Sequence, residues 1–254
     1  MEYFVNKDSI VRQIWGKGDT ILFIFAGASA EFALNKAVDW LYFTGRLPAD
    51  PLGRLFSTVA YARLIVFSEK EAANRAIDKM AAIHSRLEEK RGVLIPDWAY
   101  RDVLFMLIDY SIRSYELLER KLSDEEKNEV FQVFNRVGTR MGIQGLPETF
   151  RDWTRMRREH LEANMQKSNH TIDLYKKYHK HLGPVRYKLL LEAQKLVSPE
   201  IVLRLLGFNH VQLLTPVLKG YKLSRIFKLD WLLKAIILPK QYREEIKGLD
   251  VVPQ

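Results

Sequence analysis

Two polar side chains in the first quarter of the sequence have the types and spacing to anchor an acidic cofactor. Arg54 and Thr58 are four residues apart, so on a helix their side chains lie on one face, one turn apart. A guanidinium can form paired hydrogen bonds with a carboxylate, and the nearby hydroxyl can bond a second polar group. The same spacing also suits a surface arginine beside a threonine that bonds back to its own helix, and both interpretations stay open.

His84 is the candidate ligand for an iron atom. It follows Ala73, Ala76, Ile77 and Met80 on one face of a predicted helix, so we expect its ring to point into the protein. A neutral imidazole there can supply the axial nitrogen that haem iron requires, and small neighbours leave room for a flat macrocycle. A histidine on an apolar face can equally be an ordinary core residue whose hydrogen bonds are satisfied.

Helix signals position both groups. Asp50 and Pro51 predict the start of a helix over about residues 51–66, which carries Arg54 and Thr58. Ser68 and Glu71, spaced as in a capping box, predict the next helix, which runs to about Lys90 and carries His84. Further helices are predicted over the uncharged stretch Thr20 to Ala30, from Trp98 to Leu118, after a capping box of Ser123 and Glu126, and from Pro147 toward Met165. Two more helical segments are predicted after Gly183-Pro184. The second of these begins at Ser198-Pro199-Glu200 and ends at Gly207.

The composition is that of a folded globular protein. The chain has 254 residues, 47% hydrophobic and 28% charged, which suffices for one large domain with its own core. No stretch alternates polar and apolar residues long enough to predict a sheet, so the predicted fold is all-α. The absence of cysteine excludes disulfides, thiolate-ligated haem, iron–sulfur clusters and covalently attached c-type haem.

Positive charge gathers in the second part of the chain. Residues 1–150 hold 20 Lys and Arg against 21 Asp and Glu, whereas residues 151–254 hold 20 against 10. This excess suits either a solvated face or attraction to anionic partners, and between Pro216 and Lys240 the basic residues alternate with apolar ones as in an interfacial helix. An ordinary terminal helix packed on the core explains that pattern as well. The N-terminus has no secretory signal, which predicts a cytoplasmic protein, with peripheral membrane contact left open.

The order of these motifs resembles the catalytic domain shared by rubber oxygenase (latex-clearing protein) and the membrane-bound oxygenase of mycophenolic acid biosynthesis. In that family a helix with the pattern Asp-Pro-x-x-Arg-x-x-x-Thr precedes an Ile-His pair by about one helix, as Asp50 to Thr58 precede Ile83 and His84. The resemblance runs in general layout from about Ile10 to the C-terminus. Further landmarks are Asp97-Trp98-Ala99-Tyr100, Met106-Leu107-Ile108-Asp109 and Leu146-Pro147-Glu148-Thr149-Phe150.

The resemblance implies a bound haem b with His84 as its axial iron ligand and with Arg54 and Thr58 beside it, both near the catalytic centre. One departure matters: rubber oxygenase has a lysine just before the matched threonine, and this chain has Ser57, so no distal lysine ligand is expected. The family's acidic catalytic residue has two candidates, Glu31 and Asp39.

We therefore expect a single all-α domain over residues 1–254 with a globin-like helical core at about 10–165 and a basic helical subregion at about 170–254. The expected function is a haem b-dependent oxygenase that acts with O₂ on an unsaturated hydrophobic substrate. Two alternatives stay open: a non-catalytic haem- or lipophile-binding protein, and a helical interaction protein that docks on a membrane through its basic part. The oligomeric state is left undetermined.

Other chemistry finds no support in the sequence. A di-iron bundle needs two Glu-x-x-His pairs, and no histidine here has an acidic residue three positions before it. Gly16 and Gly18 lack the third glycine of a dinucleotide fingerprint, and Ser29 is not framed by the glycines of a nucleophile elbow. Nucleic-acid binding would depend on net charge alone, since no recognition module is present, so we do not predict it.

Overall fold

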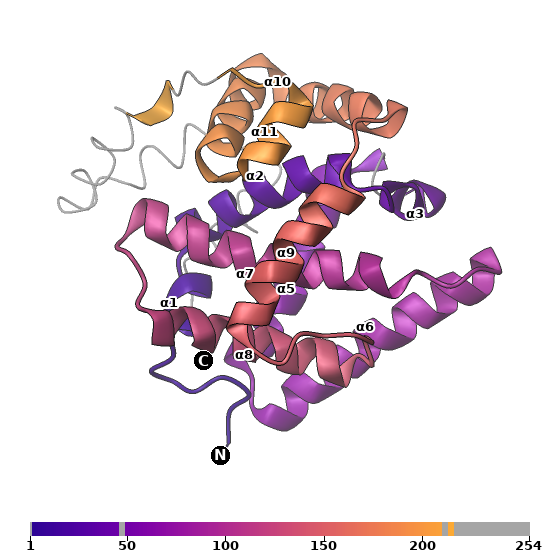
Figure 1. Cartoon of the computed structure of the whole chain (residues 1–254). Coiled ribbons are helices and arrows are strands. Elements are labelled where there is room, and N and C mark those ends of the chain that lie inside the picture. The colour runs from indigo at the N-terminus through magenta and orange to yellow at the C-terminus, as the bar shows by residue number, and fades with distance from the viewer. Residues whose placement is uncertain (1, 46–48, 210–212, 216–254) are drawn as a thin grey trace.

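The computed structural model describes residues 2–45, 49–209 and 213–215, and it is built from α-helices (Figure 1). Over these ranges there is no β-strand, only isolated bridges from Tyr3 to Glu69 and from Asn35 to Met165. The predicted all-α fold is confirmed. The helices are α1 (Ile10–Trp15), α2 (Gly18–Leu34), α3 (Val38–Phe43), α5 (Pro51–Phe67), α6 (Lys70–Arg91), α7 (Asp97–Leu118), α8 (Asp124–Arg140), α9 (Phe150–Asn164), α10 (Asn169–Val197) and α11 (Glu200–Leu206).

Helix α2 forms the centre of the fold. It packs mainly against α7 and α10 and also touches α1, α3 and α11, so it is buried on nearly every side. This confirms that the uncharged stretch from Thr20 to Ala30 is a buried helix. Gly27 permits the close approach of α2 and α7, because a Cβ atom there would lie 2.1 Å from the ring of Tyr110.

One apolar core joins distant parts of the sequence. Its buried residues extend from Phe4, before the first helix, to Val197 at the end of α10, and its largest members include Trp15, Phe105 and Phe131. Burial of such aromatic side chains is the main stabilising contribution available to a helical fold of this size. The predicted domain limits and the globin-like arrangement stay predictions.

The start of α5 agrees with the sequence. Asp50 is the N-cap residue, its carboxylate accepts a hydrogen bond of 2.9 Å from the backbone N–H of Gly53, and Pro51 occupies the first turn. A proline is well tolerated there because its missing N–H would have no partner inside the helix. The helix continues to Phe67, one residue beyond the predicted end.

The capping box predicted from Ser68 and Glu71 is wrong. Ser68 ends α5, since its N–H still bonds the carbonyl of Leu64, and α6 begins after Glu69 without a side-chain cap. The first N–H of α6, on Lys70, bonds the carbonyl of Glu2 at 2.9 Å. The carbonyl of Glu2, remote in sequence, thus accepts from an N–H at the start of α6, where we expected a capping side chain nearby in sequence.

Other predicted helix ends are mixed in outcome. The capping box of Ser123 and Glu126 is present at the start of α8, and Gly207 ends α11 in a left-handed conformation with φ of 73°. The helix predicted from Pro147 begins only at Phe150, because Thr149 caps it by accepting from the N–H of Asp152. Helix α10 bends at Gly183, where φ is 71°.

The segment from Pro216 to Lys240, for which an interfacial helix and an ordinary packed terminal helix were both left open, lies outside the described residues. Among the helices that the structure does describe, none combines the length and apolar character that a bilayer crossing requires.

Candidate functional site

Helices α5 and α6 are consecutive, pack against each other and bring the predicted site residues together. Arg54 and Thr58 share one face of α5, where Nη1 of Arg54 donates to Oγ1 of Thr58 at 2.8 Å and to Oγ of Ser57 at 3.2 Å. The Thr58 hydroxyl in turn donates to the backbone carbonyl of Arg54 at 3.2 Å. The threonine thus bonds back to its own helix, as the second interpretation of the spacing expected, and it also orients the guanidinium. The anchoring of an acidic cofactor by this pair stays a prediction.

His84 lies on α6 with one ring nitrogen engaged. Its Nδ1 is 2.8 Å from the backbone carbonyl of Met80, and because a carbonyl can only accept, Nδ1 carries the proton of the neutral ring. Nε2 then keeps its lone pair and makes no hydrogen bond to any other residue that the structure describes. A histidine whose far nitrogen is fixed by a backbone carbonyl is the usual arrangement of a metal-ligating imidazole.

The electrostatic surroundings keep the His84 ring neutral. Burial lowers the pKa of His84 from its ordinary value, and the positive charge of nearby Arg54 acts in the same direction. The hydrogen bond to the Met80 carbonyl and the charge of Glu88 raise the pKa and oppose these effects, but do not overcome them. Arg54 therefore lies close enough to His84 for its charge to act on the ring, while the cofactor-binding roles expected of the two residues stay predictions.

A tyrosine and a glutamate support the imidazole, and sequence reasoning missed this role for both. The ring of Tyr100, in the first turn of α7, meets the His84 ring edge to face with centroids 5.4 Å apart. Its hydroxyl donates to Oε1 of Glu88 at 3.1 Å, and the N–H of Ile95 donates to the same oxygen at 2.8 Å. Glu88 follows His84 by one helical turn, so the i, i+4 spacing was the available signal.

His84 is less enclosed than its apolar neighbours predicted. Within the described part of α6, the fully buried residues are Ala73, Ala76 and Ile77, all in its first half. His84 is half-buried, and the neighbouring Ile83 and the loop residue Leu94 are exposed, Leu94 to 75%. The imidazole thus lies at the edge of the core beside uncovered apolar surface.

Arg91 adds a second cation on the same side of α6, two turns after His84. Its guanidinium lies over the Trp40 ring at 3.9 Å, and Nη2 pairs with Asp39 of α3 at 2.6 Å. The other terminal nitrogen, Nη1, is buried and has no hydrogen-bond partner among the residues that the structure describes. An orphaned buried N–H is costly, and a carboxylate-bearing ligand would satisfy it.

A buried ion cluster joins α2, α7 and α9 inside the core. Arg157 of α9 donates to both carboxylate oxygens of Glu31 at 2.5 and 2.6 Å, and to Asp109 of α7 at 3.1 Å. Arg113, one turn after Asp109, pairs with the other oxygen of that carboxylate. Glu31, one candidate for the acidic catalytic residue, is only 1% exposed, and both of its carboxylate oxygens accept hydrogen bonds from Arg157. Asp39, the other candidate, lies next to α6.

A second polar cluster links the same three helices. The buried carboxylate of Asp102 accepts from Asn35 at 2.8 Å and from Asn164 at 3.0 Å, and it pairs with Nδ1 of His160. Sequence reasoning did not select these residues, because the three partners of Asp102 lie 58 or more positions from it and only the packing of three helices brings them together.

The donor set suits a porphyrin better than a metal ion bound by protein alone. Among the described residues, no three His, Asp or Glu side chains gather in a way that would hold a metal ion. One available imidazole nitrogen with two nearby guanidinium groups instead matches a flat cofactor that brings four ligands and acidic substituents of its own. The residues present therefore fit haem.

The comparisons with known proteins point to the same family as the motifs. No curated protein and no solved structure matches the chain. The sequence model of the family described as "ER-bound oxygenase mpaB/B'/Rubber oxygenase, catalytic domain" matches residues 13–236, which is most of the sequence. The protein therefore belongs to this family of oxygenase catalytic domains.

Proposed function

We propose that the protein is a haem b-dependent oxygenase that acts with O₂ on an unsaturated hydrophobic substrate. The observation that carries this proposal is the state of His84: its Nδ1–H is fixed by the Met80 carbonyl, and Nε2 is left with a lone pair beside Arg54. Membership of an oxygenase family supports O₂ and a small-molecule substrate as the reactants.

His84 would bind the haem iron, and Arg54, Thr58 and Arg91 would bind its acidic edge. When bound, haem supplies the activation of dioxygen. The chain contributes orientation: the Met80 carbonyl and the Tyr100 ring hold the imidazole, and Thr58 and Ser57 hold the Arg54 guanidinium. Ser57 has no amine, so this position would supply no second nitrogen ligand to the haem iron.

Asp39 is the better of the two carboxylates for proton transfer near the haem. Its side chain is 43% exposed and has one cationic partner, Arg91, which lies on the same side of α6 as His84. Glu31 is enclosed by both donors of Arg157 and cannot exchange a proton without breaking that buried pair. We therefore assign proton delivery to Asp39.

Hemin titration of the purified chain tests the proposal. The wild type should develop a Soret band at one hemin per chain, and His84→Ala should lose it, while His181→Ala should match the wild type. Arg54→Ala should weaken hemin binding about tenfold, because a charge-assisted hydrogen bond to a carboxylate is lost. An unchanged Soret band in His84→Ala would refute the assignment.

Oxygen consumption then separates catalysis from simple binding. The hemin-loaded protein should consume O₂ in the presence of an unsaturated isoprenoid or an unsaturated lipid, and Asp39→Asn should slow this consumption without changing the Soret band. A spectrum that responds to ligands with no O₂ uptake for any such substrate would instead establish a non-catalytic haem-binding protein.

A further inference from the structure

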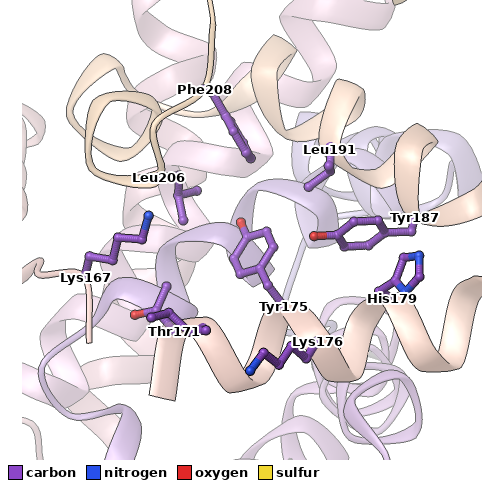
Figure 2. Close-up of a pocket in the computed structure, with 10 residues that line it drawn as sticks. Lys167, Thr171, Tyr175, Lys176, His179, Tyr187, Leu191, Leu206 and Phe208 are labelled. Atoms are coloured by element: carbon purple, nitrogen blue, oxygen red, sulfur yellow. The ribbon is translucent and has the colours of Figure 1, made fainter. Parts of the chain in front are cut away.

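A cavity whose lining includes no residue of α5 or α6 lies between the two halves of α10 and the end of α11. Helix α10 folds back at Gly183, and the cavity between its halves has a volume of about 460 Å³ (Figure 2). This size falls within the range of about 300–1,000 Å³ that is usual for small-molecule sites. In Figure 1, α10 and α11 lie at the top of the molecule and α6 at the lower right, so the two regions are distinct.

The charge of this cavity has one sign. Lys167 and Lys176 line it, and none of its lining residues is acidic. Both lysines are exposed, and neither forms an ion pair with any residue in the part of the chain that the structure describes. Two ammonium groups at one cavity without a carboxylate between them favour an anionic ligand.

Apart from Thr171 and His179, the rest of the wall is aromatic and aliphatic. Tyr175 lies in the middle of the cavity in Figure 2, and Leu206, Phe208 and Leu191 surround it. Lys167 lies on the opposite side from Leu191 and Tyr187 in this view. The cavity thus has a lysine at one side and Leu191 with the Tyr187 ring at the other, which matches a ligand with a charged head and a hydrocarbon tail.

The aromatic walls are held in place before any ligand arrives. The Tyr175 hydroxyl donates to Oε1 of Gln194 at 3.0 Å, which joins the two halves of α10. The Tyr187 ring stands edge-on to His179 with centroids 4.9 Å apart. Walls that are already ordered lower the entropic cost of binding.

We propose that this cavity binds an aliphatic carboxylate of medium chain length. The carboxylate lies between Lys167 and Lys176, and the chain runs past Tyr175 toward Leu191. This site is independent of the haem site, so it would exist even if His84 bound no iron.

Equilibrium dialysis of radiolabelled decanoate against the full chain tests the site. The double variant Lys167→Ala/Lys176→Ala should weaken binding by about fivefold to tenfold, because two exposed ionic contacts are lost. The charge-matched double variant Lys180→Ala/Lys188→Ala, whose residues lie on α10 outside the cavity lining, should bind as the wild type does. Leu191→Trp should abolish binding by filling the apolar side.

Three further measurements complete the test. Decan-1-ol, which has the same chain and no charge, should compete poorly, and His84→Ala should leave decanoate binding unchanged, which separates this site from the haem site. Far-UV circular dichroism should show that each variant is folded. Equal loss in the two lysine double variants, or unchanged binding in a folded Leu191→Trp protein, would overturn the proposal.

Discussion

The buried ion clusters of the core and the region around His84 and Arg91 contain similar polar side chains, but they differ in how many of their hydrogen-bonding groups have a partner in the chain. In the core, Arg157 is bonded to Glu31 and Asp109, and Asp102 accepts from three partners, so the chain itself satisfies these groups. At the junction of α5, α6 and α3, Nε2 of His84 and Nη1 of Arg91 have no partner among the described residues. Buried polar atoms without a partner among the described residues also occur in the core, for example Oγ1 of Thr20 and Nε1 of Trp153. The comparison therefore teaches that incomplete satisfaction at the edge of the core, where a ligand can reach, distinguishes the candidate site.

His84 and His160 make the same point as a pair of histidines. Both bond an oxygen through Nδ1, but His160 bonds a buried carboxylate in a three-helix cluster, whereas His84 bonds its own helix and faces the molecular edge. We assign a structural role to His160 and a ligand role to His84. The variants below test whether stability and haem binding separate along this line.

The largest expected effect is that of Arg157→Met. It leaves the carboxylates of Glu31 and Asp109 buried without their main cation, and breaking such a pair costs about 3–5 kcal/mol of unfolding free energy. Urea denaturation followed by circular dichroism measures this loss. Arg113→Met removes only the exposed partner of Asp109 and is the control. If both variants lose the same unfolding free energy, the buried ion cluster does not contribute more to stability than the exposed pair.

His160→Ala should have the next largest effect. Asp102 loses one of its buried partners, for which we expect a cost of about 1–3 kcal/mol. The same variant should bind hemin as the wild type does, whereas His84→Ala should lose hemin with a smaller change in stability. The opposite pattern, with hemin lost in a folded His160→Ala protein, would reverse the two assignments.

Tyr100→Phe should act more weakly. It keeps the ring against His84 and removes the hydroxyl that donates to Glu88, so we expect a loss of about 0.5–1.5 kcal/mol. Nitrogen-15 NMR of the imidazole should also show a shift in the His84 pKa, because Glu88 loses a donor and its charge acts on the ring. An unaltered titration curve would show that Tyr100 does not position His84.

The smallest expected effect on stability is that of His84 protonation. The folded pKa is below the unfolded value of about 6.5, so the unfolded chain binds more protons between these two values and stability falls as the pH falls through this window. Comparing unfolding free energies of the wild type and His84→Ala at about pH 7.5 and below pH 6.5 measures this contribution. Hemin affinity should fall over the same window, since only the neutral ring binds iron; if affinity rises instead, His84 is not the ligand.

Local patterns predicted the elements around the site well. Asp50 and Pro51 start α5 as predicted because a cap and a first-turn proline act within one turn of the chain. The capping box predicted at Ser68 was wrong, because the N–H of Lys70 donates a hydrogen bond to the carbonyl of Glu2 and no side chain caps α6. Capping rules cannot anticipate such a partner, because it is remote in sequence.

The sequence by itself determined the all-helical class, the helix that places Arg54 and Thr58 on one face, the apolar stripe that carries His84, and the family. The helical class and the two helix faces follow from spacing within single helices, whereas the family was predicted from a resemblance of motifs on successive helices. Only the tertiary structure decided that Arg157 and His160 pair with buried carboxylates in the core and that Asp39, not Glu31, lies beside α6. It alone also decided that Arg91 keeps a buried N–H without a partner in the described part of the chain. Each of these depends on which helices pack together, and packing joins residues that no local pattern connects.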